Sequence, residues 1–99
     1  MNVKLVNRGR EGILILEGVL DSNTSPKIEG ICLQMAERFD KLVLDLADVQ
    51  YLTSAALRVI KKLYMVMQKK SGLLVMKNVN ENIMEVLKVT HFDRMFIIK

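Results

Sequence analysis

Two adjacent hydroxyl side chains, Thr53 and Ser54, are the residues of this sequence with the clearest chemical potential. They follow an apolar run over residues 42–46 and a short connection, and a helical pattern begins at one of them. A hydroxyl at a helix N-terminus can accept from a free backbone N–H group and so cap the helix. The same N–H groups and the positive helix end would stabilise a phosphate. One serine could therefore be a structural cap, a phosphorylation switch, or both.

A second polar cluster, Asp21, Ser22, Asn23 and Thr24, precedes a proline that is typical of the first turn of a helix. In a parallel sheet, the loops that follow the strand C-termini gather at one end. We therefore expect Asp21 and Asn23 to lie near Ser54. The cluster is either a rim that contacts a partner or ordinary turn and capping chemistry.

The other reactive side chains do not form a catalytic constellation. His91 is the only histidine, and we interpret it as a packed or turn residue. Cys32 is the only cysteine, lies on an apolar helical stripe, and is expected to be buried and inert. Asp45 and Asp48 lack further ligands and are expected to form hydrogen bonds in a turn. Without a glycine-rich phosphate loop, we expect no ATP site. Without further ligands or a catalytic constellation, we also expect no metal, no cofactor and no enzymatic activity.

The net charge of +4 comes from cations that are interspersed with acids, which does not favour nucleic-acid binding. Arg58, Lys61, Lys62 and Met65 are expected on the outer face of the helix that begins near Ser54. That face is either a solvated basic surface or a rim that meets an acidic partner. No apolar run approaches the length of a membrane span, and no signal-peptide pattern opens the chain, so we expect a cytoplasmic protein without a membrane partner.

Periodicity and turn signals predict eight elements. Strands are expected at residues 3–6 and 12–16, paired as a hairpin, and at 41–46, 73–76 and 95–98; helices at 26–39, 54–70 and after Asn80 or Asn82. The first helix has an apolar stripe of Ile28, Ile31, Cys32, Met35, Ala36 and Phe39. The second is expected to turn Leu57, Ile60, Leu63, Tyr64 and Met67 inward and to end at a Gly72 C-cap.

The order β-β-α-β-α-β-α-β predicts one α/β domain over residues 1–99. It has a four- to five-stranded mixed sheet, an antiparallel hairpin at its start, and helices packed on its faces through right-handed crossovers. Val43 and Leu44 sit centrally in an apolar run, which indicates burial on both faces and parallel pairing.

Four segments in this order resemble the STAS domain family, and within it the small bacterial anti-sigma-factor antagonists. They are Glu-Gly-Val-Leu-Asp at 17–21, Leu-Val-Leu-Asp-Leu-Ala-Asp-Val-Gln-Tyr at 42–51, Thr-Ser-Ala-Ala-Leu at 53–57, and Leu-Lys-Val-Thr-His-Phe-Asp-Arg-Met-Phe at 87–96. The third segment is similar to the family motif Asp-Ser-Ser-Gly-Leu. Thr53 stands at its aspartate, Ala55 at its second serine and Ala56 at its glycine.

The resemblance implies an anti-sigma-factor antagonist that binds an anti-sigma serine kinase, which phosphorylates Ser54, with Thr53 as the alternative acceptor. The residues implied in partner binding are Asp21, Asn23, Thr24, Thr53, Ser54, Ala55, Arg58 and Lys61. Two alternatives stay open. The first is a STAS interaction module or scaffold that is not phosphorylated, which the departures from the motif favour. The second is a domain that binds a small ligand, since some relatives in the family bind nucleotides or lipids.

Overall fold

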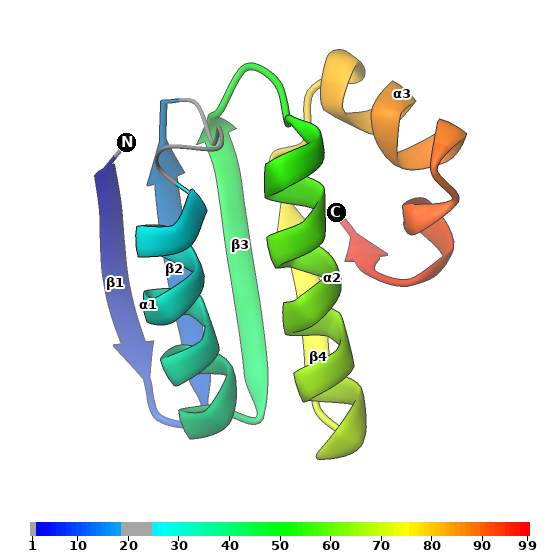
Figure 1. The fold of residues 1–99 in the computed structure, drawn as a ribbon. Helices are drawn as coiled ribbons and strands as arrows, with labels where there is room; N and C mark the ends of the chain where they lie inside the picture. Colours follow the sequence, from blue (N-terminus) through cyan, green and yellow to red (C-terminus); the bar gives the residue numbers. More distant parts are fainter. Residues whose placement is uncertain (1, 19–24) are drawn as a thin grey trace.

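The computed structural model describes residues 2–18 and 25–99 of the chain (Figure 1). The elements are β1 (Asn2–Arg8), β2 (Glu11–Glu17), α1 (Ser25–Arg38), β3 (Lys41–Asp48), α2 (Ser54–Lys69), β4 (Leu73–Lys77), α3 (Glu81–Val89), the 3-10 helix η1 (Phe92–Arg94) and β5 (Ile97–Ile98). One five-stranded sheet has the order β1-β2-β3-β4-β5, with β1 antiparallel to β2 and all later pairs parallel. The predicted fold class and element order are confirmed.

The opening hairpin is longer than expected. The strands β1 and β2 pair all the way from Arg8 with Glu11, beside the turn, to Asn2 with Glu17. Gly9 has a φ of 68°, the left-handed conformation that a two-residue hairpin turn requires. Gly12 lies inside β2, within the strand that was predicted to begin there. A Cβ at Gly12 would come within 2.6 Å of the Phe39 ring, so this glycine makes room for α1.

The helices α1 and α2 lie on the same face of the sheet (Figure 1). Helices were expected to pack against the sheet, and the strand order explains why these two share one face. The parallel strands follow one another in the order β2, β3, β4 and β5, so every right-handed crossover places its helix on the same side. Two strand residues of the helix-free face, Val43 and Val75, are nevertheless only 5% and 3% exposed.

The main core lies between the sheet and its helices. From the strands it takes fully buried leucines, among them Leu14, Leu42 and Leu44. The stripe on α1 is buried as predicted, except for Ile31, which is 42% exposed. On α2 the buried residues are Ala56, Val59, Ile60, Leu63 and Met67. Leu57 and Tyr64, both expected to point inward, are half-buried and pack against the edge of this core.

A Schellman motif ends α2, with Ser71 N–H bonded to the Gln68 carbonyl and Gly72 N–H to the Met67 carbonyl. The left-handed residue is Ser71, with a φ of 58°, and not Gly72 as predicted. Gly72 is required for another reason: a Cβ there would lie 2.7 Å from the Asp40 carbonyl oxygen.

The C-terminal end of α1 is fastened to α2 by the ammonium group of Lys70. Its Nζ donates to the carbonyl oxygens of Ala36, Glu37 and Phe39 at 3.0, 2.9 and 2.9 Å. These are among the carbonyls that a helix end leaves without partners. A cation at this position also suits the negative end of the helix dipole.

Several boundaries differ from those predicted. The helix α1 ends at Arg38 and not at residue 39, and β3 continues two residues further, to Asp48. The last strand contains only Ile97 and Ile98, because η1 takes up the chain that precedes it. His91 lies in the expected turn, where it is exposed and has a φ of 63°.

Candidate functional site

Thr53 is the N-cap of α2. Its φ and ψ of −85° and 169° are extended, and its Oγ1 accepts from the Ala56 N–H at 3.2 Å. Its carbonyl also accepts the first intrahelical bond, from the Leu57 N–H at 3.0 Å. The cap that the sequence could assign to either hydroxyl therefore belongs to Thr53.

Ser54 is the first residue of α2, and its side chain is exposed. Within the described residues, its hydroxyl makes no hydrogen bond to the protein. No acidic residue lies in the first turn of α2, so the positive end of this helix faces no carboxylate of its own first turn. The serine next to the cap thus presents a hydroxyl to solvent at a place that favours a negative charge.

Arg58, Lys61 and Met65 continue from Ser54 along one exposed side of α2, at spacings of four, three and four residues. Residues at these spacings lie on one face of a helix. We call Ser54, Arg58, Lys61 and Met65 the Ser54 ridge. Lys62 is exposed but does not belong to it, because its ammonium forms an ion pair with Glu29 on α1.

The loop that leads into Ser54 is fixed at both of its ends. Val49 and Leu52 are 1% and 6% exposed and anchor it in the core. In the first half of the loop, the carbonyl oxygens of Val49 and Gln50 each accept from Asn80 Nδ2 at 3.0 Å. Tyr51 projects from the loop and is 48% exposed, which adds an aromatic side chain to the surface before the ridge.

Asn80 has two structural roles at once. Its Oδ1 caps α3 by accepting from the Ile83 N–H at 2.9 Å, while its Nδ2 holds the loop before α2. The sequence identified Asn80 only as a possible cap of the following helix. Nothing in the pattern could show the second contact, because the partners lie about 30 residues apart in the chain.

Asp45 and Asp48 lie within β3 and not in the turn where they were predicted, but Asp45 does form hydrogen bonds near the end of the strand. Its Oδ1 accepts from the Ala47 N–H at 3.1 Å and from Asn78 Nδ2 at 2.9 Å. Asn78 has a φ of 59°, a left-handed conformation that asparagine tolerates better than most residues. This carboxylate therefore joins β3 to the turn that leads into α3.

The structure brings together the predicted residues Thr53, Ser54, Arg58 and Lys61, and Ala55 lies half-buried beside them. Asp21, Asn23 and Thr24 lie outside the described residues, so their proximity to Ser54 stays a prediction. The described chain does bring the start of their segment to this edge of the sheet, because Gly18 N–H donates to the Asp48 carbonyl at 3.1 Å.

Cys32 is 1% exposed on the core side of α1. Burial raises the pKa of its thiol to about 12, because the apolar surroundings disfavour the thiolate. The expectation of a buried cysteine is confirmed, and a neutral thiol at this place is a poor nucleophile.

A mixed five-stranded sheet with α1 and α2 on one face (Figure 1), and a helix that begins beside an exposed serine, make up a small α/β domain. The STAS domain family model matches residues 2–99. The chain therefore belongs to the STAS domain family. No curated protein matches it in sequence. None of the helices in the described part of the chain has the length and apolar character needed to cross a bilayer.

Three solved structures illustrate the likeness. A proposed anti-sigma factor antagonist from Thermotoga maritima is 21% identical, with a TM-score of 0.90 over 97% of this chain and 84% of that chain. An anti-sigma factor antagonist from Mycobacterium paratuberculosis is 20% identical, with a TM-score of 0.86 over 98% and 83%. The Bacillus cell fate determinant SpoIIAA in its phosphorylated form is 11% identical, with a TM-score of 0.79 over 99% and 91%. At these identities the likeness establishes the fold.

Proposed function

We propose that this protein is a cytoplasmic anti-sigma-factor antagonist, a regulatory binding protein without catalytic activity of its own. It engages an anti-sigma serine kinase and is switched by phosphorylation of Ser54. The main observation behind the proposal is that the two hydroxyls at the start of α2 differ in role. Thr53 caps the helix, and the Ser54 hydroxyl is exposed. The structural likeness to proteins described as anti-sigma factor antagonists supports the same assignment.

Phosphorylation of Ser54 suits the fold. A phosphoserine adds a charge of about −1.5 to −2. At an exposed helix N-terminus that charge contributes roughly 0.3–1 kcal/mol of stability, so the backbone has no reason to rearrange. Arg58, four residues further along the Ser54 ridge, places a cation one helical turn away.

The switch then acts on the interface. A dianion in a closely packed contact is costly to desolvate and repels nearby carboxylates on the partner. The kinase surface that meets Thr53, Ser54 and Ala55 also meets the cations Arg58 and Lys61, so an acidic partner surface would be steered to this site. Asp21, Asn23 and Thr24 are proposed to complete the contact from the preceding loop.

Of the two hydroxyl groups, that of Ser54 is the better acceptor of a phosphoryl group. Phosphorylating Thr53 would change the oxygen that accepts from Ala56, and so would disturb the cap. A second candidate function follows from Thr53, Ala55 and Ala56, which stand where the family motif has aspartate, serine and glycine. These departures favour an interaction module that binds its partner without being phosphorylated.

The test is to incubate the protein with ATP and an anti-sigma serine kinase from the same organism, and to measure the intact mass. We expect the mass of one phosphate to be added, and to be lost in Ser54→Ala. Ser71→Asn is the matched control, because it removes an exposed serine and asparagine tolerates its left-handed backbone. That variant should be phosphorylated normally. Kinase binding without a mass change would support the unphosphorylated module instead.

A further inference from the structure

The sheet face that α1 and α2 leave uncovered has an ordered pattern of side chains. An apolar row crosses all five strands, since the register pairs Val6 with Ile13, Ile13 with Val43, Val43 with Val75, and Val75 with Ile97. Residues paired in register lie on the same face of a sheet. The middle of this face is therefore an apolar floor.

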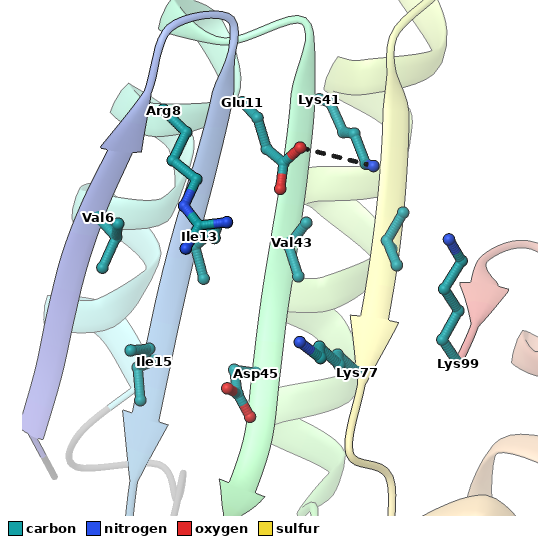
Figure 2. A pocket seen from close by; sticks show the side chains of 11 residues that line it. Val6, Arg8, Glu11, Ile13, Ile15, Lys41, Val43, Asp45, Lys77 and Lys99 are labelled. Atoms are coloured by element: carbon teal, nitrogen blue, oxygen red, sulfur yellow. Dashed lines mark ion pairs between the residues drawn. The ribbon is translucent and has the colours of Figure 1, made fainter.

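Charged rows lie on both sides of that floor. In each strand, the side chains two residues before and after the floor residue lie on the same face of the sheet as the floor residue. One flanking row contains Arg8, Glu11, Lys41 and the exposed Leu73, and the other contains Lys4, Ile15, Asp45 and Lys77. Lys99 lies beside the second row, as Figure 2 shows.

These rows surround a hollow of about 340 Å³ on the helix-free face (Figure 2). Val43 lies at its centre, and Val43 and Val75 are buried although no helix covers them. Long aliphatic stems of flanking lysine and arginine side chains can shield such a floor while their charged groups stay in water. In Figure 2 the guanidinium group of Arg8 lies near Ile13.

The charges around the hollow do not balance. Glu11 is paired with Lys41 at 3.6 Å, and the Oδ1 of Asp45 accepts from Asn78 Nδ2 and from the Ala47 N–H. Arg8, Lys77 and Lys99 form no ion pair within the described part of the chain. The face therefore offers free cations on β1 at one side, and on β4 and at Lys99 on the other.

We propose that this face docks an acidic amphipathic helix of a protein partner, lying along β2 and β3. Parallel strands are normally covered on both faces, and here one cover is missing. The strands β1 and β4 are three spacings apart, or about 14 Å. A helix with its side chains is about 10–12 Å wide. Its apolar stripe would rest on Ile13 and Val43, and its flanking carboxylates would reach the cations on both sides.

Two other occupants fit the face less well. A second copy of the chain would bring like charges into contact, which is unfavourable. A membrane-binding surface normally inserts large apolar or aromatic side chains into the lipid. Here the central valines are recessed, and the rows that cross the face contain no aromatic residue.

The probe for the test is a synthetic helical peptide of about 14 residues, with leucines along one stripe and glutamates on both sides of it. A scrambled peptide of the same composition is the control for charge alone. We expect saturable binding at low salt, with amide NMR shifts centred on β2 and β3 around Ile13 and Val43. The double variant Arg8→Glu, Lys77→Glu should weaken binding at least about tenfold.

Lys69→Glu combined with Lys88→Glu is the matched control, because it makes the same charge change at exposed positions on α2 and α3. It should change the affinity less than about twofold, as expected for distant charges screened by salt. Ser54→Asp should also leave peptide binding unchanged, which separates this proposal from the one for Ser54.

Four outcomes would overturn the docking proposal. The scrambled peptide could bind as tightly as the designed one, or the matched control could lose as much affinity as the double variant. Vesicles containing phosphatidylglycerol could bind the wild type but not the Arg8→Glu, Lys77→Glu variant, which would make the face a membrane surface. Sedimentation of the protein alone could show a dimer that the same variant abolishes, which would make the occupant a second copy.

Discussion

The helices α2 and α3 begin in almost the same way, and the difference between their first turns is informative. Both caps are extended, with φ and ψ of −85° and 169° at Thr53 and −79° and 172° at Asn80. Each side-chain oxygen accepts from the N–H three residues further on. The next residue is Glu81 in α3 but Ser54 in α2, whose first turn has no acid.

Glu81 gives α3 a permanent negative charge at its positive end, whereas α2 presents a hydroxyl at the equivalent position. A phosphate on Ser54 would make the two helix starts electrostatically alike. A difference of one residue type thus separates a helix start with a fixed charge from one at which charge can be added.

Asn80→Ala should be the most damaging change to either cap. It removes the α3 cap, at a cost of about 1 kcal/mol, and two hydrogen bonds that hold the Val49 and Gln50 carbonyls. We expect the free energy of unfolding in urea to fall by about 2–3 kcal/mol. Asn82→Ala, an exposed position in the same helix, is the control and should change it by less than about 0.5 kcal/mol. Equal losses in the two variants would contradict the double role of Asn80.

Thr53→Ala removes the oxygen that caps α2, and with it the hydrogen bond from the Ala56 N–H. We expect a loss of about 1 kcal/mol in the same urea measurement. Thr53→Ser keeps the oxygen and should recover most of that loss. If serine were no better than alanine at this position, the hydrogen bond to Ala56 would not be the source of the stability.

Ser54→Glu should have the smallest effect and the opposite sign. It reproduces the first residue of α3 and should stabilise the protein by roughly 0.3–1 kcal/mol at low ionic strength. Because the helix end favours the negative form, we expect the pKa of the introduced carboxyl to be lowered in the folded state. The gain is therefore present above the ordinary glutamate pKa and is lost as the pH falls through the folded value. Ser54→Gln is the uncharged control, and a gain of equal size in that variant would exclude the dipole as the cause.

Much of the fold could be predicted from local patterns, because each of those features depends on neighbours in the chain. The stripe from Ile28 to Phe39 identified α1, and the hydroxyl pair at 53 and 54 marked the start of α2. Periodicity does not set the edge of a stripe, so Ile31 was expected to be buried and is exposed.

What could not be predicted depends on register and on long-range contacts. The single-sided arrangement of α1 and α2 follows from the strand order, which the alternation of elements leaves open. The charged rows on the uncovered face appear only once Val6, Ile13 and Val43 are paired. The bond from Asn80 to the loop before Ser54 likewise joins residues that no short pattern connects.

The triple hydrogen bond from Lys70 gives the molecule a fixed base. It ties the C-terminal ends of α1 and α2 together at the pole opposite Ser54, where Leu73 N–H also binds the Asp40 carbonyl at 3.0 Å (Figure 1). If the proposed partner binds near Ser54, we expect any backbone adjustment at that end of the domain and not at this base. An event at the serine would then be read locally, without loosening the remainder of the domain.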